Sequence, residues 1–234
     1  DLYYPVDFAS AGSSQMGGNI GTNAGGIKVI RYGMTRQWIM GLTVVTGKGD
    51  ILNLNRGMVK NATGYDLRQL FIGSEGTLGL VTHAQIKLDR LPQDLNVMVL
   101  GMDSFNDVMN VLSAFQAKID LTAFEFFDDT AIDKLMAHGQ VQEPFESRTK
   151  FYTLLEFEAP YEPIMDMAMA IFEDCMEQGW VIDGVMSQNL AQAEELWKLR
   201  EYISETISVF TPYKNDVSVL ISYVPDFIDE IDKI

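Results

Sequence analysis

The sequence predicts an α+β fold built from two parts. Up to about residue 92 the chain is dense in glycine and turn-forming residues, whereas from residue 93 it alternates β-prone segments with amphipathic helical segments. Pro92 ends a strand-like run at this seam, and 234 residues exceed the usual size of one domain. We therefore expect one domain over residues 1–92 and a second over residues 93–234.

The first part contains a β-hairpin signal followed by a longer strand. Residues 42–45 and 51–54 are β-prone, and the glycine-rich residues 47–50 between them tolerate positive φ. Residues 80–88 alternate apolar and polar side chains over their later half, as a strand does. His83 falls on the polar phase of that strand, so we interpret it as a solvated or hydrogen-bonded histidine rather than a ligand.

The second part has the periodicity of strands separated by helices. The expected strands span residues 95–102, 124–127, 151–158, 180–186 and 217–221. Helices are expected to follow Ser104, over residues 131–137, from Pro163 to Gly179, from Asn189 to Ile207, and from Pro225 onward. The expected boundary residues are Ser104 and Asn189 as N-caps, Pro163 and Pro225 in first turns, and Gly139 and Gly179 at C-terminal ends.

Charge excludes several classes of partner. The formal net charge is −16, which repels nucleic-acid backbones and acidic lipid headgroups. A site for a carboxylate must therefore be built locally from a few cations. No apolar run approaches the roughly 20 residues that span a bilayer, so we expect no integral membrane segment. A single cysteine is compatible with a reducing compartment, and we expect a cytoplasmic protein. Peripheral membrane association and a homodimer stay open as alternatives.

Cysteine and histidine usage gives no sign of a disulfide or a metal centre. Cys175 is the one cysteine, so it cannot form an internal disulfide, and its helical setting favours a buried structural thiol over a reactive one. His83 and His138 lie far apart in the sequence. We therefore expect no metal site in this chain.

Both ends of the sequence look incomplete. Ile234 continues an apolar helical stripe without a cap, and about fifteen residues precede the first glycine block without forming a clear element. We expect an internal fragment of a longer protein.

The glycine-rich block over residues 12–26 is the most informative stretch. Its glycines let the backbone approach a ligand closely, and the hydroxyl and amide side chains among them offer neutral hydrogen bonds. The block matches neither the P-loop nor the Rossmann fingerprint, which argues against ATP hydrolysis and NAD binding. From spacing alone, such a loop is structural as often as it binds a cofactor. A second glycine block over residues 73–79 shifts the balance towards a ligand.

Four segments carry a family resemblance: residues 17–26, 31–33, 60–67 and 71–79. In this order they resemble the FAD-linked oxidases of the vanillyl-alcohol-oxidase/PCMH-type flavoprotein superfamily. The resemblance is greatest to the branch with D-2-hydroxyglutarate dehydrogenases, D-lactate dehydrogenases and glycolate oxidases. It covers about the first 90 residues, and the remainder resembles the family's C-terminal cap more loosely. It implies part of a PCMH-type FAD-binding subdomain, then a ferredoxin-like α+β cap with an antiparallel sheet.

The resemblance implies a set of binding residues by position. In the cap, Arg200, Ser204 and Lys214 match segments that hold the substrate carboxylates. From pattern alone, Arg200 is better interpreted as a surface partner of Glu195, Glu201 or Glu205, and the resemblance reverses this preference. The implied FAD-binding residues are Ser13, Ser14, Gly17, Gly18, Asn19, Thr22, Asn23, Gly26 and Val81.

The implied reaction is oxidation of a D-2-hydroxy acid to the 2-oxo acid by hydride transfer to flavin N5, with an electron acceptor that the sequence does not name. The family also has an earlier FAD-binding subdomain and a later histidine motif, which this sequence lacks. We therefore expect the proton-accepting base, and any metal, to lie outside the chain, and the chain by itself to be inactive. The alternatives are a related flavoenzyme with another substrate, such as an ether-lipid synthase or a sugar-nucleotide reductase, and a non-catalytic module.

Overall fold

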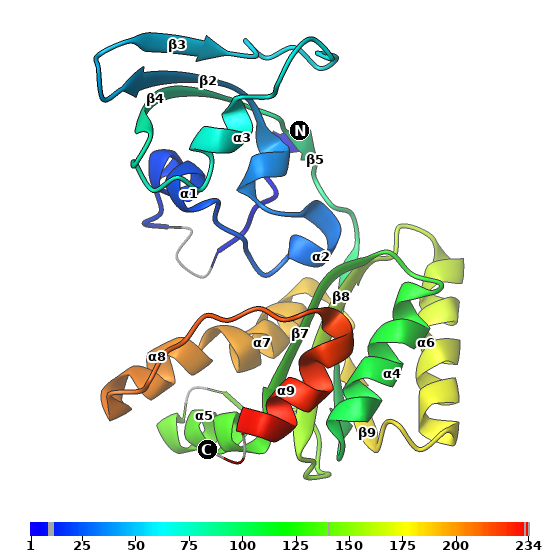
Figure 1. Ribbon diagram of the computed structural model, residues 1–234. Coiled ribbons are helices and arrows are strands. Elements are labelled where there is room, and N and C mark those ends of the chain that lie inside the picture. The colour runs from blue at the N-terminus through cyan, green and yellow to red at the C-terminus, as the bar shows by residue number, and fades with distance from the viewer. Residues whose placement is uncertain (9–11, 140, 232, 234) are drawn as a thin grey trace. The chain divides into compact units, whose positions relative to one another are not determined.

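The computed structural model describes residues 1–8, 12–139, 141–231 and 233 (Figure 1). The chain divides into two compact units, Asp1–Gln93 and Asp94–Ile234. No helix in the described part of the chain is both long enough and apolar enough to cross a membrane.

The first unit is built on a three-stranded antiparallel sheet of order β3-β2-β4. The predicted hairpin is confirmed, because Val45 pairs with Ile51 and Leu42 with Leu54. The predicted strand over residues 80–88 is confirmed as β4, which pairs with the other side of β2. The elements are β1 (Leu2–Tyr3), α1 (Met16–Thr22), α2 (Val29–Tyr32), a 3-10 turn (Thr35–Trp38), β2 (Ile39–Thr46), β3 (Ile51–Leu54), α3 (Arg68–Phe71), β4 (Gly79–Ile86) and β5 (Asp89–Arg90), which pairs with β1.

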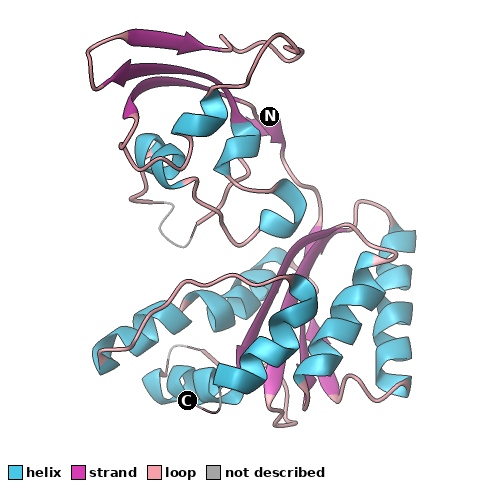
Figure 2. Cartoon of the chain, viewed as in Figure 1, coloured by secondary structure: helices cyan, strands magenta, loops and turns pink. Residues whose placement is uncertain are grey.

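One face of this sheet is covered by short helices (Figure 2). Ile20 of α1 and Phe71 of α3 pack with the alternate side chains Leu42 and Val44 of β2. The sequence did not indicate α1, because three glycines in seven residues oppose helix formation. The remaining members of this core are Ile39, Leu54 and Ile72.

The second unit has a four-stranded antiparallel sheet of order β7-β8-β6-β9. In chain order its strands and crossover helices run β6-α4-β7-β8-α6-β9, with α5 inserted between β7 and β8. The ferredoxin-like topology is therefore confirmed. The elements are β6 (Leu95–Met102), α4 (Phe105–Gln116), β7 (Leu121–Asp128), α5 (Asp129–His138), β8 (Phe151–Glu158), α6 (Glu162–Glu177), β9 (Asp183–Met186), α7 (Leu190–Glu201), α8 (Ile203–Ile207), 3-10 turns at Ser208–Phe210 and Ile221–Tyr223, and α9 (Val224–Ile231).

Helices cover both faces of the second sheet (Figure 1). On one face, α4 and α6 pack over Leu155, Phe157 and alternate residues of β6, which are Met98, Leu100 and Met102. On the other face, α7 lies across β6, β7 and β8. Because side chains alternate along a strand, Glu156 points to the α7 face between Leu155 and Phe157.

The predicted helix caps at Ser104, Asn189 and Gly139 agree with the structure. Ser104 and Asn189 are N-caps whose side chains accept the backbone N–H groups of Asp107 and Gln192, at 3.2 and 3.0 Å. Gly139 ends α5 in the left-handed region, with φ of 75°. The turn chemistry of these residues therefore defined the elements correctly.

Three expectations about the second unit are wrong in part or in full. Residues 217–221 do not form a strand: Val217 and Val219 are exposed, and the segment has no sheet partner among the described residues. The expected helix from Asn189 breaks at Tyr202 into α7 and α8. Strand β9 is shorter than expected, because the N–H groups of Trp180 and Val181 bond back to the Cys175 carbonyl and extend the end of α6.

Candidate functional site

Helix α1 contains three glycines that the fold itself does not require. A Cβ added at Gly17, Gly18 or Gly21 would meet no described atom within 4 Å, and none of the three has a positive φ. Glycine inside a helix costs up to about 1 kcal/mol relative to alanine. An uncovered main chain at these positions suits a ligand that lies directly against it.

The second glycine block holds the end of α1 in place. The N–H of Gly73 donates to the Ile20 carbonyl and the N–H of Glu75 to the Gly21 carbonyl, each at 2.9 Å. Gly73 and Glu75 can present these groups because both have positive φ, 84° and 49°. The structure thus brings the two glycine blocks together, although about 50 residues separate them in the sequence.

The polar side chains around α1 are either exposed before the helix or hydrogen-bonded to the backbone at its end. Ser13 and Ser14 are exposed, and the Asn19 amide donates to Ser14 Oγ at 3.4 Å. Asn23 has a role in the fold, because its Oδ1 accepts the N–H of Arg36 at 3.0 Å. The hydroxyl of Thr22 donates to the Gly18 carbonyl at 3.1 Å.

Gly26 and Val81 lie against their own unit. A Cβ on Gly26 would lie 1.7 Å from the Asp7 carbonyl oxygen, so glycine is required there by close packing. Val81 lies in β4 with its side chain packed against the core of the first unit. Both positions therefore have a structural explanation in addition to the predicted one.

Charge is distributed unevenly between the two units. Asp1–Gln93 contains 9 Lys and Arg against 6 Asp and Glu, a net charge of +3, and Asp94–Ile234 contains 8 against 27, a net charge of −19. Residues 8–49 include no acidic side chain. The segment that forms α1 therefore has no negative side chain of its own, and the nearby Glu75 meets the C-terminal end of the helix, away from its first turn.

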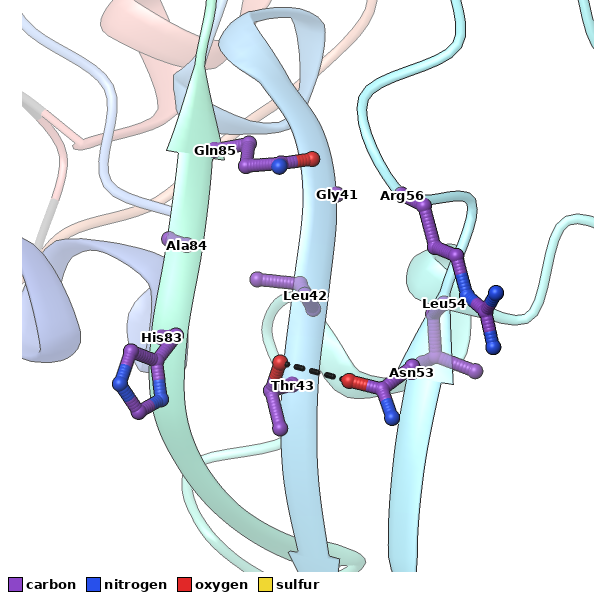
Figure 3. A pocket seen from close by; sticks show the side chains of 9 residues that line it. All are labelled: Gly41, Leu42, Thr43, Asn53, Leu54, Arg56, His83, Ala84 and Gln85. Carbon is purple, nitrogen blue, oxygen red and sulfur yellow. Dashed lines mark hydrogen bonds between the residues drawn. The ribbon is translucent and has the colours of Figure 1, made fainter.

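A separate pocket of about 540 Å³ lies on the sheet face opposite α1 (Figure 3). Thr43 donates to Asn53 Oδ1 at 3.0 Å, and His83 is exposed beside Thr82 Oγ1 at 3.2 Å. The interpretation of His83 as a hydrogen-bonded surface histidine is confirmed. The pocket lining is Gly41, Leu42, Thr43, Asn53, Leu54, Arg56, His83, Ala84 and Gln85, and includes neither glycine block.

In the second unit, Arg200 projects from α7 onto the sheet. Its Nε donates to Glu125 Oε2 on β7 at 2.6 Å, and both side chains are partly buried. The three surface partners considered from the sequence are wrong, because Arg200 pairs with Glu125, and Glu195 pairs with Lys198. The sequence could not indicate Glu125, which lies 75 residues from Arg200.

A second acidic residue lies under the same helix. Glu156 is 3% exposed, and its two oxygens accept from Thr122 Oγ1 at 2.7 Å and Trp197 Nε1 at 2.9 Å. A charged residue within the apolar run of residues 151–157 was a signal for this arrangement that the sequence analysis did not use. The bond from Trp197 anchors α7 to the sheet three residues before Arg200, and the bond from Thr122 holds Glu156 in place.

The other two predicted substrate residues lie on the surface. Ser204 is exposed in α8, beyond the break at Tyr202, and Lys214 is exposed in the extended segment that follows α8. Within the described residues, no hydrogen bond or ion pair joins any two of Arg200, Ser204 and Lys214. The described part of the chain contains no cluster of His, Cys, Asp or Glu side chains that could hold a metal ion.

Comparison with known proteins shows the family. Residues 91–234 match the family model of FAD linked oxidases, C-terminal domain, and residues 1–55 match a FAD binding domain. The chain belongs to the FAD-linked oxidases. The resemblance seen in the four sequence segments is confirmed, and FAD is the cofactor that this membership indicates.

Several curated proteins resemble this FAD-linked oxidase along its whole length. A D-2-hydroxyglutarate dehydrogenase of Stutzerimonas stutzeri is 65% identical over 100% of the chain and 50% of its own length. One from Xanthomonas citri is 56% identical over 98% of the chain and 48% of its own length. The mitochondrial D-2-hydroxyglutarate dehydrogenase of Danio rerio is 34% identical over 99% of the chain and 44% of its own length. The chain thus spans about half the length of the curated relatives it matches.

Solved structures of more distant proteins share the fold. An alkyldihydroxyacetonephosphate synthase aligns over 89% of the chain and 39% of its own, with a TM-score of 0.64 and 19% identity. A p-cresol methylhydroxylase with substrate bound aligns over 87% and 43%, with a TM-score of 0.58 and 15% identity. At these identities the likeness concerns the fold alone.

The residues around α1 fit the pyrophosphate of FAD. The first turn of an α-helix leaves its N–H groups without intrahelical partners, and here that turn is Met16, Gly17 and Gly18. The glycines leave these groups uncovered, the serines before them add neutral donors, and no carboxylate occurs within residues 8–49. The donor set of this segment, and its lack of acidic side chains, therefore suit a dinucleotide anion.

Proposed function

We propose that the whole protein is an FAD-dependent dehydrogenase that oxidises a D-2-hydroxy acid to the 2-oxo acid. D-2-hydroxyglutarate is the first candidate substrate, because the relatives at 65% and 56% identity have that name across the full length of this chain. The observation that carries the proposal is Arg200: it is held through Nε, which leaves the two terminal nitrogens for a carboxylate.

The proposed cofactor residues are the nine predicted from the sequence. Around α1, the backbone N–H groups of Gly17 and Gly18 would bind phosphate oxygens, while Ser13, Ser14 and Asn19 would donate neutral hydrogen bonds. Thr22 would line the site and accept a hydrogen bond, because its hydroxyl donates to the Gly18 carbonyl. Asn23 and Gly26 would shape the turn, and Val81 would contact the flavin through its backbone. When bound, FAD supplies the acceptor for the two electrons removed from the substrate.

The proposed substrate residues hold the acid in place. Arg200 would bind one carboxylate through two parallel N–H bonds, and Ser204 would add a hydroxyl. Lys214 would supply a second positive charge, which a dicarboxylate such as 2-hydroxyglutarate can use and lactate cannot. The group that takes the hydroxyl proton is not assigned to this chain.

The proposal can be tested on the whole protein with a panel of 2-hydroxy acids and an artificial dye acceptor. We expect flavin absorbance, and the highest kcat/KM for D-2-hydroxyglutarate, with its L-enantiomer inactive. A preference for lactate or glycolate would contradict the dicarboxylate substrate. A colourless protein that does not respond to added FAD would favour the non-catalytic alternative.

Arg200→Ala should raise KM on the order of 10- to 100-fold while FAD stays bound, because one charge-assisted fork is lost. Arg200→Lys is the matched control, since it keeps the charge and loses the planar fork. We expect it to recover only part of the loss. An unchanged kcat/KM in Arg200→Ala would remove this residue from the site.

A cytoplasmic location is also proposed. Its support is the single cysteine, which is compatible with a reducing compartment. The animal and plant relatives are named as mitochondrial proteins, so the location of this chain has to be measured by fractionation.

A further inference from the structure

We infer that Glu125 is a positioning residue for Arg200, a role that rests on the proposed function. Glu125 holds the guanidinium by its Nε edge, so that the terminal nitrogens face outward in one fixed orientation. The carboxylate of the substrate then meets a fork that is already aligned.

The geometry of the contact supports this role. Arg200 Nε lies 2.6 Å from Glu125 Oε2, and this is the one hydrogen bond of the Arg200 side chain within the described residues. A guanidinium has five N–H donors in a rigid plane, so a partner at Nε fixes the plane and leaves the Nη1 and Nη2 pair available. The bond therefore orients the group without using its terminal fork.

Glu125 is itself held in place. It lies on β7 opposite Leu154 of β8, within a continuous antiparallel ladder. Helix α7 is tied to the same sheet by the Trp197–Glu156 bond, three residues before Arg200. Both ends of the Glu125–Arg200 contact therefore belong to packed elements, unlike a contact between two surface loops.

The pair is far less exposed than an ion pair at the surface, as is the pair of Arg68 and Asp66, at 16% and 42%. The Arg200 and Glu125 side chains are 33% and 21% exposed, whereas Lys233 and Glu230 are 64% and 72% exposed. Ion pairs between exposed side chains contribute little to stability, and their side chains keep much of their conformational freedom. A partly buried pair restricts its members more strongly.

The charge of the second unit gives a reason for such a tether. Asp94–Ile234 contains 27 Asp and Glu against 8 Lys and Arg, so carboxylates far outnumber cations in the unit that contains Arg200. A fixed partner at Nε prevents these from capturing the terminal nitrogens. Preorganisation of this kind lowers the cost of binding.

Two substitutions separate positioning from simple electrostatics, measured on the whole protein with D-2-hydroxyglutarate and a dye acceptor. Glu125→Gln keeps the length and an oxygen acceptor but removes the charge. Glu125→Asp keeps the charge but withdraws the oxygens from Arg200 by one methylene. We expect Glu125→Asp to raise KM about tenfold with kcat and flavin content little changed, and Glu125→Gln to raise it much less.

A double-variant cycle and a surface control complete the test. In an Arg200→Ala background, Glu125→Asp should have no further effect on KM, because Glu125 acts through Arg200. Glu195→Gln, which removes the partner of Lys198 on the same helix, should leave KM unchanged.

A lower KM in Glu125→Asp would overturn the inference, because Glu125 would then compete with the substrate for Arg200. A larger rise in KM in Glu125→Gln than in Glu125→Asp would also overturn it. So would an equal effect of Glu125→Asp on KM in the unmodified protein and in Arg200→Ala. The proposed function fails separately, when Arg200→Ala leaves kcat/KM unchanged.

Discussion

At the scale of single residues, glycines in this chain have different reasons to be glycine. Gly26 is required by the Asp7 carbonyl oxygen, 1.7 Å from where its Cβ would lie. Gly18 has open space around it and ordinary helical φ, so the fold alone would accept alanine. The structure thus separates a packing glycine from a glycine whose cost has to be explained by a ligand.

Gly18→Ala should therefore affect stability and cofactor binding in opposite directions. The free energy of unfolding should stay equal or rise by up to about 1 kcal/mol, because alanine favours the helix and restricts the unfolded chain. FAD affinity of the whole protein should fall, because the methyl group occupies the ligand's place. Denaturant unfolding and flavin titration measure the two effects.

Gly26→Ala is the control, and it should lose stability. Normal FAD affinity in Gly18→Ala would show that α1 does not lie against the cofactor.

Cys175 adds a pH dependence to stability. It is fully buried in α6, and this burial, followed by the negative charge of Asp174, raises the pKa of its thiol to about 11. Between pH 9 and pH 11 the folded chain keeps a proton that the unfolded chain releases, so stability falls as pH rises through this range.

We expect the denaturation midpoint to drop more between these two pH values in the native sequence than in Cys175→Ala. Equal drops of the midpoint in both proteins would show that the thiol does not contribute to the pH dependence of stability. At neutral pH the thiol should also resist alkylation until the chain unfolds.

At the scale of elements, capping residues predicted the ends of helices in the second unit correctly, whereas the alternation of apolar residues alone predicted a strand that does not form. Ser104, Asn189 and Gly139 act through local hydrogen bonds or φ, so their roles are visible in sequence. The alternation of residues 217–221 resembles a strand, but a strand also needs a free sheet edge, which local sequence does not report. Helix α1 was missed for the complementary reason, since its glycines mask a helix that packing supports.

In the candidate site, too, local motifs could be predicted from the sequence and long-range contacts could not. Its glycine blocks and Arg200 could be found from sequence motifs. Their contacts could not, because Gly73 meets α1 and Glu125 meets Arg200 across long stretches of chain.

Helix α7 should depend on the indole of Trp197. Trp197→Phe keeps most of the apolar volume but removes the Nε1–H that Glu156 Oε2 accepts. Leaving a buried carboxylate oxygen without this donor should lower the free energy of unfolding by about 1–3 kcal/mol.

Trp180→Phe is the control at a partly buried position in the same unit, and it should lower the free energy of unfolding by less than Trp197→Phe does. Equal losses in chemical denaturation would mean that the cost comes from volume rather than from the hydrogen bond.

At the scale of the whole molecule, the two units differ in both core and charge. One core cluster lies within residues 20–72 and another within residues 98–181, so each unit buries apolar side chains of its own. The first unit has a net charge of +3 and the second of −19. Self-repulsion should therefore destabilise the second unit more than the first.

Salt should consequently shift the two units by different amounts. Raising the ionic strength from about 0.01 M to about 0.15 M shortens the Debye length from about 30 Å to about 8 Å, which screens the repulsion in the second unit. The three tryptophans allow each unit to be followed, since Trp38 lies in the first and Trp180 and Trp197 in the second. In Trp38→Phe, tryptophan fluorescence should report a urea midpoint that rises with salt.

A Trp180→Phe/Trp197→Phe chain, in which Trp38 alone reports, should show a midpoint that changes little with salt. Urea is the suitable denaturant because, unlike guanidinium chloride, it adds no ions of its own. Midpoints that moved together in both variants would mean that the units unfold as one cooperative body. The segregated charge would then act on the whole chain, and the two cores would not be separate sources of stability.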